Sequence, residues 1–349
     1  MVESTPVALV EVYRPETKTP FSATALSFNP TVEGELWVTL RQFPSAELCT
    51  RADESSCSAL RGIVGVVTDA TGDSPSGALK EDGNSWHFMR RPTAIAWGDE
   101  RLFATCGEGW TDNYEDDTIP YAGPTLWSSD PSIFGVEPLP EQNGTHLDML
   151  HETPLCMGIA HEAGNAFWAF NGLAGSLDRV DFHEPHQIGG ENHSDGEVHR
   201  YISGQLSRLA EVPSHLAYDN ARGRVYVADT GHGRVLSVDP STARASDDIT
   251  LYEPLHDSGA MEGATVKELV PPGRLQKPSG LALAGDVLYV TDNATSLIYS
   301  FDASGKLQQA FDTALPAGSL AGLTIGPDAK LYVANLSNGS AHRVELALD

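Results

Sequence analysis

Hydrophobic and polar positions alternate along the chain in short runs that recur six times in the same order. Each copy has a short apolar run, a polar turn, and a second run with an aromatic residue at its second position. The copies lie at residues 22–40, 92–106, 156–171, 213–229, 278–292 and 320–335. The shared aromatic residues are Trp37, Phe103, Trp168, Tyr226, Tyr289 and Tyr332. Apolar runs bounded by polar turns are typical of β-strands, so each copy predicts an antiparallel strand pair.

Two more strands follow in the clearest copies. RVLSVD and DITLYE (248–253) close the fourth copy, and LIYSFD and KLQQAF close the fifth. Four antiparallel strands repeated six times predict an all-β, six-bladed β-propeller. The sixth copy supplies only three strands, whereas an additional strand at 7–13 (VALVEVY) precedes the first copy. We predict that this N-terminal strand completes the last blade and closes the ring, which removes an exposed edge.

The whole chain is expected to form one domain. Its 349 residues fit a single propeller, and its 33 glycines and 22 prolines indicate many turns. The blades are predicted at residues 21–90, 91–151, 152–211, 212–255, 276–313, and 318–349 together with 7–13.

The acidic balance narrows the range of partners. Asp and Glu number 48 against 22 Lys and Arg, which gives a net charge of −26. Such a surface repels nucleic acid. No apolar run approaches the roughly 18 residues that span a bilayer. We therefore expect a monomer that binds a small-molecule or peptide ligand, with no nucleic-acid partner and no membrane insertion.

Four cysteines favour an oxidising compartment. Cys49 and Cys57 share one polar loop, where a disulfide would close a small ring. Cys106 ends one predicted strand and Cys156 begins the inner strand of the next blade, so their ends are neighbours. We predict the disulfides Cys49–Cys57 and Cys106–Cys156, and an exported protein, periplasmic or extracellular, over a cytoplasmic one. Four free thiols are the alternative.

Two blades carry a recognisable motif. The phrase D-x-G-x-x-R-V at 229–235, together with YVTDNATSLIYSFD at 289–302, resembles NHL repeats. Within that superfamily the chain is distantly similar to peptidyl-hydroxyglycine α-amidating lyases, which carry zinc on histidines at the mouth of the ring, often in a Pro-His-small-Leu phrase. The nearest phrase here is PSHL at 213–216, in which the histidine, His215, stands one position later. The resemblance implies a propeller, a zinc ion and a lyase reaction.

Strand direction sorts the histidines between two faces. The face of the propeller at which the inner strands begin is called the upper face. His87, His151 and His215 each precede or begin an inner strand, in blades two, three and four, so their side chains are expected to converge on the central channel. This trio is our first choice of metal ligands. Arg90 and Arg91 follow His87 and are expected to bind an anionic group of the substrate. Long upper loops at 42–61, 106–124 and 255–275 would build the pocket.

The lower face carries a second histidine cluster. His183, His186 and His193 lie in one loop, and His161 ends the inner strand of the same blade. Glycines 189 and 190 would let this loop fold back. Imidazoles with nearby carboxylates suit a transition metal, with zinc or copper preferred. Each of these histidines is alternatively a hydrogen-bonded structural residue, and the lower loop is alternatively a solvated surface.

One acidic loop offers calcium as an alternative metal. It contains Asp112, Glu115, Asp116 and Asp117, but their spacing is not that of a regular calcium loop, so a solvated acidic surface is the competing reading.

Motifs for covalent catalysis are missing from the sequence, which has no G-x-S-x-G, no H-E-x-x-H and no phosphate-binding glycine loop. Two functions remain open. The first is a metal-dependent lyase or hydrolase, or an oxidase if the metal is redox-active, that acts on a small organic or peptidic substrate at the channel mouth. The second is a non-catalytic propeller that binds a ligand or protein, in which any metal is structural.

Overall fold

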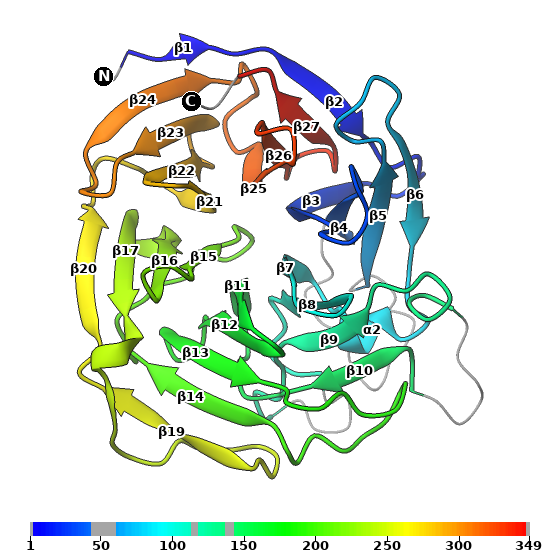
Figure 1. Cartoon of the computed structure of the whole chain (residues 1–349), viewed down its shortest axis with the longest axis vertical. Helices are drawn as coiled ribbons and strands as arrows, with labels where there is room; N and C mark the ends of the chain where they lie inside the picture. The colour runs from blue at the N-terminus through cyan, green and yellow to red at the C-terminus, as the bar shows by residue number, and fades with distance from the viewer. Residues whose placement is uncertain (1–2, 43–60, 113–117, 137–142, 347–349) are drawn as a thin grey trace.

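Six sheets, each built on four antiparallel strands, surround a central axis in the computed structural model, which describes residues 3–42, 61–112, 118–136 and 143–346 (Figure 1). From the inside outward, blade 1 contains β3 (Phe21–Phe28), β4 (Leu36–Gln42), β5 (Gly62–Thr68) and β6 (Ser76–Lys80). Blade 2 contains β7 (Pro92–Trp97), β8 (Leu102–Gly107), β9 (Thr125–Ser128) and β10 (His146–Met149). Blade 3 contains β11 (Cys156–Ala163), β12 (Ala166–Asn171), β13 (Ser176–Asp181) and β14 (Glu197–Tyr201).

The remaining blades repeat this plan. Blade 4 contains β15 (Leu216–Asp219), β16 (Arg224–Asp229), β17 (Arg234–Asp239) and β20 (Thr265–Val270). Blade 5 contains β21 (Pro278–Ala284), β22 (Val287–Asp292), β23 (Leu297–Phe301) and β24 (Leu307–Asp312). Blade 6 contains β25 (Leu320–Ile325), β26 (Leu331–Asn335), β27 (Ala341–Val344) and the N-terminal β2 (Leu9–Tyr13). The predicted six-bladed propeller is confirmed.

The repeated aromatic residues hold neighbouring blades together. All six are at most 8% exposed. Trp37 of blade 1 packs edge-on against Trp97 of blade 2, with ring centroids 5.2 Å apart, and Tyr332 of blade 6 packs against Phe28 of blade 1 at 4.8 Å. Each ring buries about 150–250 Å², which explains why this position is aromatic in every copy.

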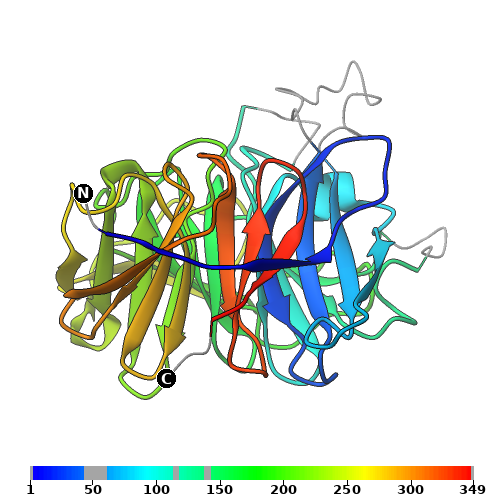
Figure 2. The same ribbon diagram turned by 90° about the horizontal axis from the view of Figure 1, so that it is seen from above.

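The N-terminal segment closes the ring, as predicted. β2 pairs antiparallel with β27, and the preceding β1 (Thr5–Pro6) pairs parallel with β24 of blade 5. Figure 2 shows this dark-blue segment crossing the outside of the last two blades. The Tyr13 ring lies against blade 1, where a Cβ at Gly65 or Gly77 would come within 2.5 Å of it. Because both positions are glycine, the Tyr13 side chain of blade 6 can pack against blade 1.

The fourth strand of blade 4 differs from the prediction. Residues 248–253 form no strand, and β20, a dozen residues later, pairs with β17 instead. The intervening chain crosses to blade 3, where β19 (Asp257–Glu262) pairs parallel with β14 and the short β18 (Arg244–Ala245) pairs with β19. This crossing brings residues 250–254 beside blade 3.

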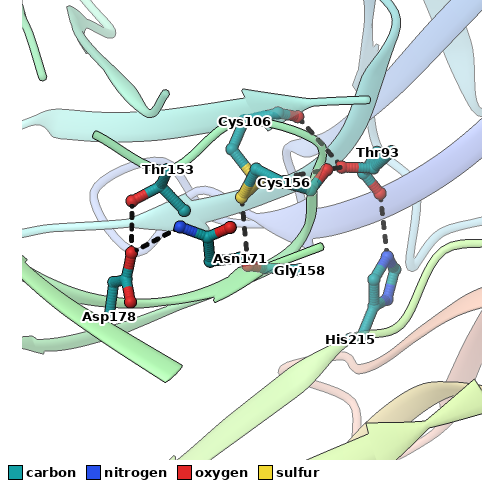
Figure 3. Close-up of a disulfide and its surroundings, with 8 residues drawn as sticks. All are labelled: Thr93, Cys106, Thr153, Cys156, Gly158, Asn171, Asp178 and His215. Atoms are coloured by element: carbon teal, nitrogen blue, oxygen red, sulfur yellow. Dashed lines mark hydrogen bonds between the residues drawn. A yellow bond between two sulfur atoms is a disulfide. The ribbon is translucent and has the colours of Figure 1, made fainter. Parts of the chain in front are cut away.

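A disulfide joins blades 2 and 3, as predicted. Cys106, in β8, is bonded to Cys156 at the start of β11, with their Cα atoms 5.7 Å apart (Figure 3). The Thr93 hydroxyl lies between the two strands, 2.8 Å from the Cys156 carbonyl. The predicted pair Cys49–Cys57 lies outside the described residues. Among the described residues, no helix has the length and apolar character needed to cross a membrane.

Candidate metal centre

A cavity of about 530 Å³ lies between blades 2 and 3, beside the outer strand β10. Its walls come from five segments: the short helix α2 (Ser85–Phe88), the loop between β8 and β9, β10 with the turns that flank it, the loop between β13 and β14, and the segment before β19. The lining residues that bear imidazole or carboxyl groups are His87, Asp112, His146, His151, Glu191, His193 and Glu253.

The loop between β13 and β14 reaches the cavity by lying along β10. The backbone N–H of His186 donates to the Leu147 carbonyl at 2.9 Å, and that of Gly189 donates to the His146 carbonyl at 2.9 Å. Gly189 has a φ of 64°, and a Cβ at Gly190 would lie 2.9 Å from His186 Nδ1. The two glycines therefore permit the change of chain direction that the sequence predicts. The loop does not fold back onto its own blade, however, but crosses to β10 of blade 2.

Four histidines meet here with one ring nitrogen engaged and the other without a partner. Nδ1 of His146 bonds the Asn143 carbonyl at 2.9 Å, and Nδ1 of His186 bonds the Gln187 carbonyl at 2.7 Å. Nδ1 of His151 and Nδ1 of His193 both lie 3.1 Å from Glu253 Oε2. The four Nε2 atoms are buried and have no hydrogen-bond partner among the described residues. Acceptors at Nδ1 fix the tautomer that leaves the Nε2 lone pair free, as metal-binding histidines require.

Two overlapping sets of groups have metal-ligand spacing. The potential ligand atoms of His146, His186 and His193 lie within 4.8 Å of one another, as do those of His151, His193 and Glu253. The first set consists of three imidazoles whose Nε2 atoms have no partner among the described residues. Its three ring-centroid separations are 5.0, 5.5 and 6.4 Å. The first two are close to the distance of about 5 Å expected between imidazoles around a tetrahedral ion. The first set fits a metal ion better.

Burial lowers the pKa values of His87, His146, His151 and His186 and so favours their neutral forms. It lowers the pKa of His146 to about 3, and the neighbouring His186 and His193 lower it further. Burial, followed by the effect of His151, lowers the pKa of His87 to about 3. Burial alone would raise the pKa of Glu253, but hydrogen bonds from His151 and His193 lower it to about 2. A carboxylate that accepts from two imidazoles orients both rings.

Two carboxyl groups near the cluster have raised pKa values. Asp148 is fully buried, and its Oδ2 has no partner among the described residues. Burial raises its pKa to about 8. Asp112 lines the cavity with an unpartnered Oδ1, and burial raises its pKa to about 7 although Arg90 lowers it. Both groups are protonated well above the pH at which free carboxyls ionise.

The raised pKa of Asp148 predicts a pH-dependent stability difference. The unfolded carboxyl ionises near pH 4, whereas the folded one stays protonated to about pH 8. The folded state therefore binds the extra proton, and the metal-free protein loses stability as pH rises through this window, by at most about 1.4 kcal/mol per pH unit. Asp148→Asn has no such group. We expect urea unfolding of metal-free protein to show the variant near wild type at pH 4 and more stable at pH 8. A difference that does not grow with pH would contradict a protonated Asp148.

The upper trio of predicted ligands is divided between two places. His87 and His151 line the cavity, and the His87 ring hydrogen bonds to the backbone of Asp112. His215 lies instead on the channel axis, where Nε2 donates to the Thr93 carbonyl at 2.9 Å (Figure 3). This bond joins blade 4 to blade 2, and a Cβ at Gly322 of blade 6 would meet the His215 ring at 3.1 Å. His215 therefore closes the channel rather than joining His87 and His151.

Ion pairs lie above His215. Arg41 of blade 1 donates to the backbone carbonyl of Glu211, which precedes blade 4 on the opposite side of the ring, and contacts Glu108 at 3.4 Å. Arg91 pairs with the carboxylates of Glu108 and Glu211. Arg90 donates to the Thr111 carbonyl at 2.7 Å. Neither Arg90 nor Arg91 lines the cavity, and the anion-binding role of this pair stays a prediction.

The lower cluster is also divided. His186 and His193 lie in the groups with metal-ligand spacing beside the cavity. His161 Nε2 donates to the Gly164 carbonyl at 3.0 Å, at the turn between β11 and β12. His183 stays at the lower rim of blade 3, 3.1 Å from Glu197. Of the predicted calcium ligands, Asp112 lines the cavity, and Glu115, Asp116 and Asp117 lie outside the described residues.

Sequence reasoning missed His146 and Glu253. A signal existed for His146, because His146 and Asp148 lie two positions apart in a strand otherwise formed by apolar residues. Nothing comparable existed for Glu253, since residues 248–253 were assigned to a strand of blade 4.

The comparisons with known proteins identify the fold. No family model matches the sequence, and no curated protein matches it. A calcium-binding protein, regucalcin, from Agrobacterium tumefaciens aligns over 99% of this chain and 96% of its own, with 13% identity and a TM-score of 0.58. An auxiliary nutrient binding protein from Bacteroides thetaiotaomicron aligns over 93% of this chain and 69% of its own, with 12% identity and a TM-score of 0.58. A streptogramin B lyase aligns over 97% of both chains, with 10% identity and a TM-score of 0.51.

These proteins place the chain among six-bladed propellers similar in fold to regucalcin and streptogramin B lyase. At such low identity the likeness concerns the fold alone. The closer similarity to amidating lyases stays a prediction. The described residues contain groups with the spacing to bind a metal ion.

Proposed function

We propose that the protein is a propeller metalloenzyme that holds a transition metal ion, zinc or copper, on Nε2 of His146, His186 and His193. The observation that carries this proposal is the set of buried Nε2 atoms without partners, on rings whose Nδ1 atoms are already engaged. A structural histidine would use both nitrogens or expose one to water. Three protein ligands leave a coordination position open, as in catalytic zinc sites.

The cavity beside the ligands supports catalysis over a purely structural metal. Its volume of about 530 Å³ lies within the range of small-molecule sites. A bound metal ion would polarise a substrate oxygen or activate water. His151, held by Glu253 at Nδ1 and stacked on Tyr121 with ring centroids 3.8 Å apart, lines the cavity with a rigid imidazole. Asp112, with a pKa of about 7, can donate or accept a proton near neutral pH.

The reaction class follows from these groups. A metal with an acid–base carboxyl suits hydrolysis or elimination on a small organic or peptidic substrate, and copper would change the reaction to an oxidation. The alternative is a propeller that binds a ligand or protein without catalysis, in which the metal fixes the loop between β13 and β14. The hydrogen bonds that tie this loop to β10 favour that reading. We also propose an exported protein, because a disulfide is stable in an oxidising compartment.

Cobalt substitution separates the two functions. Protein purified without a histidine tag would be loaded with Co²⁺, and its visible absorption recorded before and after addition of azide. With an open position that faces the cavity, azide should shift the spectrum in wild type, and His186→Asn should abolish both the original bands and the shift. Bands that azide leaves unchanged would indicate a closed, structural site, and failure to bind Co²⁺ would refute the metal centre.

A further inference from the structure

Three carboxylates form a row across the lower rim of blade 3. Asp181 of β13 is the register partner of Glu197 of β14, and Glu197 is the register partner of Asp257 of β19. Residues directly opposite each other have their Cβ atoms about 4.5–5.5 Å apart on the same face, and like charges in such pairs are destabilising. The sheet register therefore brings together three groups that repel one another when ionised.

Neighbouring cations offset this repulsion only in part. Arg179 lies 3.4 Å from Asp181 but also pairs with Glu162 at 2.9 Å. His199 lies 3.3 Å from Asp257 at the other end of the row. Among the described residues, Glu197 in the centre has no Lys or Arg in its ion pairs.

Two imidazoles from separate loops converge on the central carboxylate. His183 Nε2 and His256 Nδ1 each lie 3.1 Å from the same atom, Glu197 Oε1. Ligand atoms around a tetrahedral zinc ion, at bond lengths of about 2.0–2.1 Å, are separated by about 3.3 Å. The potential ligand atoms of Asp181, His183 and Glu197 lie within 4.8 Å of one another. The rim therefore has both the donor types and the spacing of a metal site.

We propose that Asp181, His183 and Glu197, with His256 as a fourth donor, bind a second divalent metal ion, separate from the metal centre in the cavity. Mixed imidazole and carboxylate ligands suit zinc and similar transition metals. The ion would neutralise the row of carboxylates. It would also anchor the start of the loop that carries His186 and His193, because His183 begins that loop. The proposal uses none of the ligands of the first site.

The rim site is expected to bind metal more weakly than the metal centre. His183 is 41% exposed and His256 is 69% exposed, so both side chains lose conformational freedom on coordination. Isothermal titration of metal-free wild type with Zn²⁺ should therefore show two equivalents, the second at least tenfold weaker than the first.

Matched variants distinguish the two sites. Glu197→Gln and His183→Asn should each abolish the weaker equivalent and leave the tighter one unchanged. His199→Asn alters a histidine two residues from Glu197 on the same strand and should retain both. If Glu197→Gln and His183→Asn leave the number of equivalents unchanged, or if wild type binds one equivalent that only His186→Asn removes, the rim proposal is wrong and the metal centre stands. If wild type binds one equivalent that only Glu197→Gln removes, the metal centre fails instead.

Discussion

Replacement of His186 by asparagine is expected to remove the tightly bound metal ion from the cavity with little change in the stability of the metal-free protein. His186 is only partly buried, and its Nε2 has no partner among the described residues, so the fold loses no hydrogen bond at that atom. The metal, in contrast, loses one of three protein ligands. The measurement is Zn²⁺ affinity by competition with a chelator, together with thermal unfolding of the metal-free proteins.

Two further variants are expected to reduce metal affinity less than His186→Asn does. Glu253→Gln changes the carboxylate that accepts from His193 and His151, without removal of a ligand. Loss of such an outer partner costs roughly 10- to 100-fold in metal affinity, and His186→Asn should cost more. His161→Asn is the matched control, since His161 lies in the same blade but contacts the Gly164 carbonyl and Asp99 and does not line the cavity.

Replacement of His215 distinguishes the two predicted locations of the metal ion, the cavity and the channel mouth. His215→Ala should retain the metal ion and lower the stability of the protein, because the bond to the Thr93 carbonyl across the channel is lost. If the metal ion disappears with His215→Ala and survives His186→Asn, the site lies at the channel mouth, as the sequence predicted.

Deletion of residues 1–14 is expected to abolish cooperative unfolding of the propeller. The deletion removes the four register pairs between β2 and β27, and it uncovers the edge of β27. Val12 and Tyr13 are 4% and 6% exposed, and burial of each side chain contributes roughly 1.5–3 kcal/mol. A total loss of about 5 kcal/mol equals the whole stability of a marginal domain. Calorimetry and urea unfolding provide the measurement.

A shorter deletion provides the control. Removal of residues 1–4 leaves β1 and β2 intact, so this protein should unfold like the full chain. Tyr13→Ala tests the contact with blade 1 alone and should produce an intermediate loss of stability. A protein without residues 1–14 that melts as cooperatively as wild type would show that the ring does not depend on this closure.

The fold could be predicted because its determinants are local and repeated. The aromatic residue at the second position of each second strand occurs in every copy, and all six are buried between blades. Blade order alone places Cys106 beside Cys156, and that disulfide is present. The error in blade 4 arose because DITLYE has the composition of a strand, whereas the chain at that point crosses to another blade.

The site could be predicted only in part, because strand direction fixes the face on which a loop begins and not its lateral path. His186 and His193 were assigned to the lower face, where their loop starts, but hydrogen bonds to β10 carry the loop along the outside of blade 2 to His151. Glu253 reaches the same place through the insertion in blade 4. Contacts between two long loops from different blades depend on packing that one sequence does not specify.

The position of the metal in crystals of the untagged, zinc-loaded protein tests the central claim most directly. Anomalous diffraction at the zinc absorption edge should show a peak between blades 2 and 3, about 2.0–2.1 Å from Nε2 of His146, His186 and His193. A peak at the upper mouth of the channel beside His215, or zinc-loaded crystals with no peak among these three histidines, would contradict the account.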